Sequence, residues 1–235
     1  MPYLCKSCGG EEPVQDGVPC SNCGGRVLKA EGAVFNYTGS RIGMIVEGDP
    51  NSPTGRRVES RPASGGTADS SVAADGAFQA SLSGPLDLGR KGERRVIKTL
   101  CNKLRERGAD VHVEDDARDD FGEDAILVID GRRTPVQIVT VPNKAPIWKD
   151  LNVNKTVTLS GDLQGAVSIL RDAVVAKSVK GKGTILALDV AHVGAIVNRA
   201  LVDAYLVAFG DPVAEFSFGA VWLVGPTPRS TIELR

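Results

Sequence analysis

The pattern that most constrains the fold is an alternation of helical and strand-like segments from about residue 85 onward. The first helical segment is GRKGERRVIKTLCNKLRERG, in which apolar residues recur at three- and four-residue intervals. Further helices are expected at 162–179 and 192–210, and strands at 110–115, 124–130, 134–141, 183–190 and 216–225. The order α-β-β-β-α-β-α-β predicts an α/β domain with a central mixed sheet and helices on both faces.

Local signals refine this α/β prediction. Asp130 and Gly131 form a dipeptide typical of a tight hairpin between two strands. The segment GTILALDV is apolar almost throughout, which favours a strand at the centre of a sheet. Cys101 falls in the apolar spacing of the first helix, so we expect a small buried residue there.

The residues before this domain differ in composition. Residues 39–84 include GDPNSPTGRRVESRPASGGTADSSVAADG, which is rich in Gly, Ser, Pro, Ala and Asp and has no sustained period. Such a composition predicts a flexible linker. The expected organisation is therefore a small module at 1–38, a linker at 39–84 and the α/β domain at 85–235.

The N-terminal module carries two cysteine pairs, CKSCGG and CSNCGG. Each pair has two intervening residues, and their four thiolates are Cys5, Cys8, Cys20 and Cys23. This spacing is typical of a zinc ribbon, in which four thiolates complete a tetrahedral shell and leave no open position for catalysis. Disulfides and a redox motif are the alternatives. We predict a structural Zn²⁺, with the ribbon available for contact with a protein partner or with DNA.

Charge limits how the protein can bind nucleic acid. The chain has 28 Lys and Arg against 29 Asp and Glu, so any such contact needs a local basic patch. The first helix is the basic element, and its candidate phosphate contacts are Arg90, Lys91, Arg94, Arg95 and Lys98. The alternative is an ordinary solvated helix face.

Neither a membrane segment nor a secretory signal is expected. No apolar run approaches the ~18 residues that a membrane helix needs, and MPYLCKSCGG does not combine a basic segment with an apolar one. A membrane is therefore not an expected partner, and the cytoplasm is the expected location.

An acidic run that ends at Asp124 enters the segment DAILVID, and Gln137 lies on the following strand. With the element order above, these residues resemble the PD-(D/E)xK superfamily, whose fold is called restriction-endonuclease-like. The resemblance covers about residues 87–225. It implies an αβββαβ core and a nuclease that uses Mg²⁺ or Mn²⁺ to hydrolyse phosphodiesters, with DNA as the expected substrate.

The resemblance assigns roles to individual residues. Asp124 matches the metal-binding aspartate, Gln137 the following Glu or Gln, and Glu93 the glutamate of the first helix. The lysine normally found two residues after the Glu or Gln is replaced by Val139, and Lys177 on the 162–179 helix is a candidate substitute. The acidic run can equally be a solvated loop, Gln137 a strand-edge hydrogen-bonding residue, and Glu93 a helix-capping acid.

Three functional interpretations remain open at this point. The first is a metal-dependent nuclease with a displaced lysine. The second is a catalytically inactive module that has kept the nuclease fold to bind nucleic acid or a protein partner, which Val139 and the near-neutral charge favour. A third, a zinc-ribbon adaptor with the second domain as scaffold, predicts no metal beyond the zinc.

Overall fold

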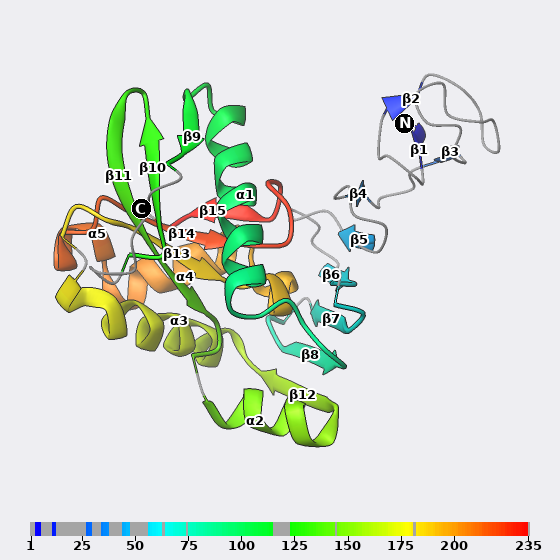
Figure 1. Ribbon diagram of the computed structural model, residues 1–235. Helices are drawn as coiled ribbons and strands as arrows, with labels where there is room; N and C mark the ends of the chain where they lie inside the picture. The colour runs from blue at the N-terminus through cyan, green and yellow to red at the C-terminus, as the bar shows by residue number, and fades with distance from the viewer. Residues whose placement is uncertain are drawn as a thin grey trace.

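The computed structural model describes residues 3–5, 11–12, 27–29, 34–37, 44–47, 56–62, 64–73, 75–114, 123–143, 145–180 and 182–234 (Figure 1). Side chains are described from residue 56 onward within these ranges, except at 145 and 180. Two six-stranded sheets account for most of the described strands.

The central sheet is mixed and has the order β15-β14-β13-β11-β10-β9. Its strands are β9 (Val111–Val113), β10 (Ala125–Ile129), β11 (Arg132–Thr140), β13 (Ile185–Asp189), β14 (Ala220–Val224) and β15 (Thr231–Glu233). Strands β11, β13 and β14 run parallel, and the three outer pairings are antiparallel. Strand β13 is buried at every position, as its apolar sequence predicts.

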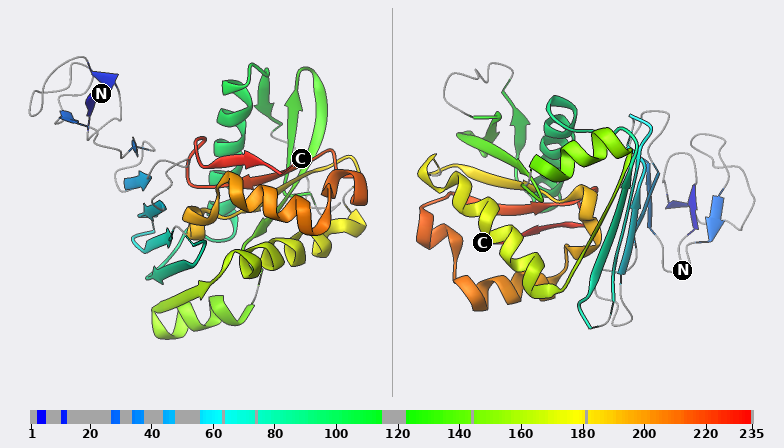
Figure 2. Two further views of the ribbon diagram at one scale, coloured as in Figure 1. Left: turned by 180° about the vertical axis from the view of Figure 1, so that it is seen from behind. Right: turned by 90° about the horizontal axis from the view of Figure 1, so that it is seen from below.

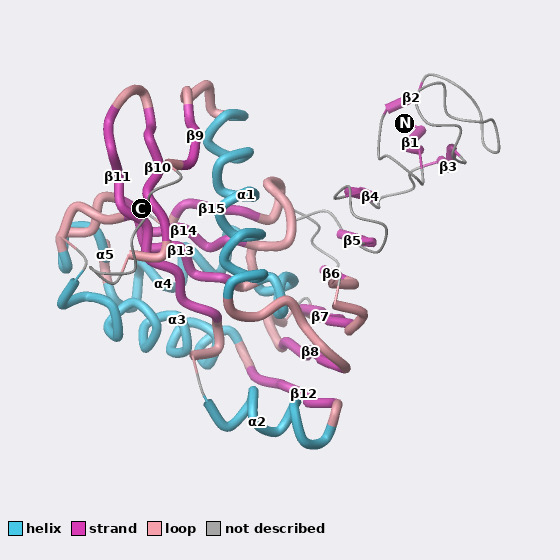
Figure 3. Tube along the Cα trace, viewed as in Figure 1, coloured by secondary structure: helices cyan, strands magenta, loops and turns pink. Residues whose placement is uncertain are grey.

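Helices cover both faces of this sheet (Figure 3). The helices are α1 (Arg90–Glu106), α3 (Leu163–Lys177), α4 (Arg199–Phe209) and the short α5 (Pro212–Phe216). Helix α1 packs against the face that carries Val136 and Ala187, whereas α3 and α4 pack against the face that carries Val139 and Leu188. The predicted α/β class, with a mixed sheet between helices, is confirmed. Cys101 is 2% exposed in the α1 layer.

The β10–β11 hairpin turns at the dipeptide that the sequence indicates. Asp130 and Gly131 both have positive φ, at 49° and 78°, between the paired residues Ile129 and Arg132. Two successive residues with positive φ define the turn that best matches the twist of a hairpin. The turn therefore fixes the register of β11 against β10.

The second sheet is antiparallel and has the order β12-β8-β7-β6-β5-β4. Its strands are β4 (Val34–Tyr37), β5 (Met44–Glu47), β6 (Arg56–Ser60), β7 (Thr67–Val72), β8 (Phe78–Ser83) and β12 (Thr156–Gly161). The prediction of a flexible linker over 39–84 is therefore wrong. Small residues such as Ala68, Ser70 and Ala80 alternate with polar ones that are half-buried or exposed, so the strands are weakly apolar but still bury one face.

The 3₁₀ helix η3 (Ala191–Ile196) joins the two sheets, which stand against each other in Figure 2. The guanidinium of buried Arg56 on β6 donates to the carbonyl of Val197, and the hydroxyl of Ser70 accepts from the N–H of Ala195 at 3.0 Å. Gly194 approaches so closely that an added Cβ would lie 3.0 Å from Val58 Cγ1. These contacts place the antiparallel sheet at the carboxyl end of β13.

Three other expectations need correction. The helix expected at 192–210 is broken into η3 and α4, because the Asn198 side chain caps α4 by accepting from the N–H of Leu201. The strand expected at 216–225 begins only at Ala220, after α5. The sequence also gave no prediction of α2 (Ala145–Asn154), β12 or β15.

The N-terminal module is described only as backbone strands. They are β1 (Tyr3–Cys5), β2 (Glu11–Glu12) and β3 (Val27–Lys29), in the antiparallel order β2-β1-β3. Cys8, Cys20, Cys23 and the side chain of Cys5 lie outside the described part of the structure. The zinc site stays a prediction.

Candidate functional site at the free edge of β11

Strand β11 extends beyond the strand that flanks it. Strand β10 pairs with β11 only as far as the Ala125–Val136 pair, but β11 continues to Thr140. Asp124 closes the gap, because its N–H donates to the carbonyl of Val136 at 2.9 Å and its Oδ2 accepts from the N–H of Ile138 at 2.6 Å. Backbone groups alternate between the two sides of a strand, so those of Thr140 come next on the same edge.

A hollow of about 450 Å³ opens at this edge. The described residues that line it are Leu88, Ile138, Val139, Thr140, Asn143, Trp148 and Lys177. They come from the segment before α1, from β11 and the loop after it, from α2 and from the end of α3. The volume falls in the range of about 300–1,000 Å³ that is typical of small-ligand sites. The hollow is therefore the candidate functional site.

Val139 and Lys177 meet in this lining. Val139 is 5% exposed and points toward the α3 side of the sheet. Lys177 is the last residue of α3 and is half-buried. Lys177 therefore lines the same hollow as Val139, from the end of the helix that packs on that face of the sheet.

The other predicted catalytic residues lie at different depths. Asp124 is exposed and borders the hollow through its bond to Ile138. Gln137 is 2% exposed and shares the face of Val139. Glu93 lies in the first turn of α1, which covers the opposite face of the sheet, and it is not among the described residues lining the hollow. Of the predicted catalytic residues, Lys177 is thus in the described lining, and Asp124 is hydrogen-bonded to the lining residue Ile138.

The residues can be tested against the divalent ion that the resemblance implies. Mg²⁺ is often held by one or two carboxylates together with waters and substrate phosphate, and the Asp124 carboxylate could supply one such ligand. Within the described part of the chain, no group of three or more His, Cys, Asp or Glu is close enough to hold a metal. Asp115, Asp116, Asp119 and Asp120 of the acidic run lie outside the described residues.

The basic residues of α1 divide into two groups. Arg90, Lys91, Arg94 and Lys98 are exposed and remain candidates for phosphate contact. Arg95 is different, because its guanidinium contacts Asp189 Oδ2 at 2.5 Å with only 23% of its side chain exposed. The prediction that Arg95 binds phosphate is therefore not supported by its position. It neutralises a carboxylate that is 2% exposed.

Asp189 belongs to a buried polar cluster behind the hollow. It pairs in register with Thr140, and its Oδ1 accepts from the N–H of Ala191 at 3.2 Å. Nearby His192 is 1% exposed, and burial lowers the pKa of its imidazole to about 4, against a smaller raising effect of Asp189. His192 is therefore neutral at physiological pH, as expected for a packing residue. This cluster was not predicted from the sequence. The one local sign of it is that Asp189 ends the otherwise apolar segment ILALD.

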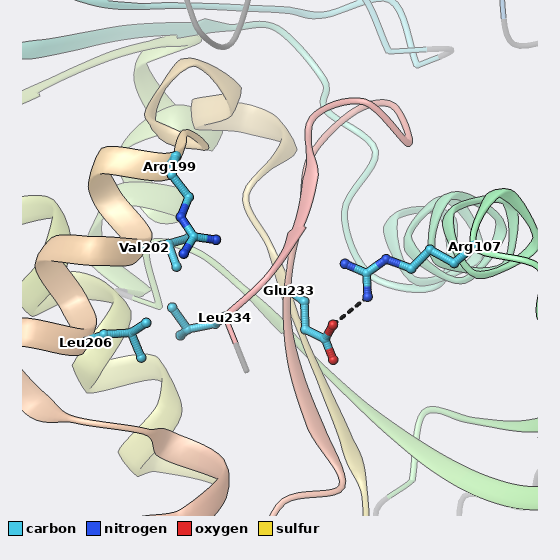
Figure 4. A pocket seen from close by; sticks show the side chains of 6 residues that line it. All are labelled: Arg107, Arg199, Val202, Leu206, Glu233 and Leu234. Atoms are coloured by element: carbon cyan, nitrogen blue, oxygen red, sulfur yellow. Dashed lines mark hydrogen bonds and ion pairs between the residues drawn. The ribbon is translucent and has the colours of Figure 1, made fainter.

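A second hollow, of about 360 Å³, lies between α4 and β15 (Figure 4). Arg107 and Arg199 both line it, but Arg107 pairs with Glu233 at 2.5 Å and Arg199 pairs with Asp203 at 3.0 Å. Arg107 also lies 4.5 Å from the ring centre of Trp222. Both guanidinium groups among the described residues of this hollow are thus engaged in ion pairs with carboxylates.

Comparison of the chain with protein-family models, with curated proteins and with solved structures gave no match. The case for a function therefore depends on the residues themselves. Among the helices that the structure describes, none is long and apolar enough to cross a bilayer.

Proposed function

We propose that this chain is a divalent-metal-dependent nuclease of the PD-(D/E)xK type in which Lys177 takes the place of the usual strand lysine. The observation that carries the proposal is that Val139 and Lys177 line one hollow, at the edge of β11 that Asp124 borders. The order α1-β9-β10-β11-α3-β13, with α2 and β12 inserted, agrees with the αβββαβ core of that superfamily.

The proposed roles follow from the positions of the side chains. Asp124 is the metal ligand, and Gln137 behind it sets the local polarity of β11. A bound divalent ion would polarise the scissile phosphate and favour ionisation of a water molecule. Lys177 brings a positive charge to the hollow, where it stabilises the charge that develops on the phosphate. Arg90, Lys91, Arg94 and Lys98 hold the nucleic-acid backbone on the exposed side of α1.

The test is cleavage of plasmid DNA, linear DNA, single-stranded DNA and RNA with Mg²⁺ or Mn²⁺, using wild type beside Asp124→Ala. We expect metal-dependent cleavage by the wild type and a loss of at least about 100-fold in the variant, as for other groups that stabilise transition-state charge. No cleavage of any substrate by folded, zinc-loaded protein would contradict the proposal.

A second candidate is a non-catalytic module that binds nucleic acid. One observation favours it: the described residues include no cluster of three or more metal-binding side chains around Asp124 or elsewhere. This candidate predicts nucleic-acid binding that depends on Arg94 but is unchanged by EDTA and by Lys177→Met. The nuclease proposal predicts that cleavage responds to both.

A further inference from the structure

The insertion between β11 and α3 supplies an aromatic wall to the hollow. Helix α2 follows β11 directly, and β12 then joins the antiparallel sheet beside β8. Trp148 on α2 lines the hollow, and Leu151 on the same helix is buried against Leu82 and Leu86. Because β12 anchors the insertion to the second sheet, α2 is held in place at the rim of the hollow.

The indole ring of Trp148 is fixed in orientation. Its Nε1 donates to the carbonyl of Pro142 at 3.2 Å. On another side the ring makes an edge-type contact with His192, with ring centres 5.8 Å apart and an interplanar angle of 68°. His192 is itself 1% exposed. Two fixed neighbours, one polar and one aromatic, hold a half-buried ring that still borders the hollow, so little rotamer entropy is lost when a ligand contacts it.

The groups around this ring match the parts of one nucleotide. Asn143, exposed in the loop after β11, carries an amide that can both donate to and accept from a base edge. Thr140 adds a hydroxyl, and Lys177 adds the cation that a phosphate requires. Leu88 and Ile138 give the hollow apolar walls. An aromatic ring, an amide and a lysine around a hollow of about 450 Å³ are the elements of a base-stacking site.

We propose that Trp148 stacks on an unpaired nucleobase, and that the preferred ligand of this hollow is therefore single-stranded nucleic acid. This inference rests on the proposed nucleic-acid function and adds its substrate class. In a duplex, neighbouring base pairs already cover the faces of each base, so only an unpaired or extruded base can lie against the indole. Asn143 then contacts the edge of that base, and Lys177 contacts its phosphate.

The chain allows a direct spectroscopic test, because it has two tryptophans in contrasting places. Trp222 is 2% exposed in the core, whereas Trp148 borders the hollow. We would titrate full-length Trp222→Phe protein, in an Asp124→Asn background that prevents cleavage, with a thymidine oligonucleotide, a duplex of equal length and a single-stranded RNA. Base stacking quenches indole fluorescence, so emission from Trp148 should fall on addition of either single strand but not of duplex.

Affinity measurements on the Asp124→Asn protein complete the test. Trp148→Leu should weaken single-strand binding by about tenfold or more, the loss expected for one base stack, while Trp148→Phe should retain most of the affinity. Arg94→Ala, on the exposed face of α1, should weaken binding of single strand and duplex alike. The relative affinity for DNA and RNA identifies the natural strand, and quenching by either one supports the proposal.

Two results would overturn the inference: emission from Trp148 that does not change with any single strand, or equal affinity for single strand and duplex. Both readouts are independent of catalysis. Quenching without any cleavage by the wild type would keep the base-stacking site and reject the nuclease. Cleavage without quenching would do the reverse.

Discussion

The carboxylate of Asp124 accepts a hydrogen bond from the backbone N–H of Ile138 at 2.6 Å, in the place where the next residue of β10 would otherwise pair. Asp124 therefore has a structural role as well as its proposed metal-binding role. Any substitution at this position tests both roles at once unless the replacement keeps an acceptor.

Asp124→Asn separates the two roles, because an amide oxygen can still accept from Ile138 but carries no charge. We expect both Asp124→Asn and Asp124→Ala to lose cleavage. Only Asp124→Ala should lose stability, by about 1 kcal/mol for one hydrogen bond. Urea unfolding beside the cleavage assay checks this. Full activity of the Asn variant would show that the carboxylate charge takes no part in the reaction.

Lys177→Met should reduce cleavage by at least about 100-fold, because it removes the cation that faces the hollow while keeping the length of the side chain. Lys182→Met, at an exposed position after α3, is the matched control and should leave activity unchanged.

A rescue experiment adds Val139→Lys to Lys177→Met, which returns an ammonium group to the hollow from β11. We expect single-turnover rates to recover in part, despite the cost of a lysine at a buried position. Wild-type rates in Lys177→Met alone would remove Lys177 from the site.

Arg94 and Arg95 are neighbours on α1 with opposite predicted behaviour. Arg94→Ala should change the free energy of unfolding by less than about 0.5 kcal/mol, as at most surface sites. It should also make the affinity for nucleic acid less dependent on salt concentration, by the amount expected when one phosphate contact is lost. Arg95→Ala leaves the Asp189 carboxylate, 2% exposed, without its guanidinium, and should destabilise the fold by about 3–5 kcal/mol. Urea unfolding and binding at several salt concentrations distinguish them.

The sequence predicts the α/β part of the fold well, because its helices and strands carry strong periodicity. The spacing of Val96, Leu100 and Cys101 predicts α1, and Asp130-Gly131 predicts the β10–β11 turn. Prediction from the sequence fails for the antiparallel sheet, where several buried positions are small or polar, as at Ala68, Ser70 and Arg56. The buried Ser70 hydroxyl and Arg56 guanidinium bond to backbone groups of Ala195 in η3 and of Val197 after it, more than 120 residues away, which no local pattern reveals.

The site is predictable in its strand residues but not in its lining. Asp124 lies directly before β10, as the pattern of the DAILVID segment predicts, and Lys177 lines the hollow from the end of α3. Trp148 and Asn143 belong to a weakly amphipathic segment and the loop before it, so their convergence with Lys177 depends on tertiary packing. Glu93 was predicted on the apolar stripe of α1, and that stripe packs on the face of the sheet opposite Val139.

The cysteine pairs predict one tightly bound zinc per chain. Native mass spectrometry should find a single Zn²⁺, and Cys20→Ser should remove it, because a structural site needs all four thiolates. Cys101→Ser is the control, since Cys101 is 2% exposed in the core around α1 and should not affect zinc content. Zinc retained in the Cys20→Ser protein would place the metal elsewhere.

Stability should fall as the pH drops from about 6.5 toward 4, and His192 is the reason. Burial lowers the pKa of the folded-state imidazole to about 4, below the value of about 6.5 in an unfolded chain. Between these values the unfolded state binds a proton that the folded state does not, so the stabilising contribution is present above pH 6.5 and is lost progressively below it. The loss is on the order of 3 kcal/mol at pH 4.

Urea unfolding from pH 4 to 8 measures this loss of stability, and His192→Phe should flatten the profile across this range. His112→Phe, at an exposed position on β9, should leave the slope unchanged, and a slope that persists in His192→Phe would assign the proton to other groups.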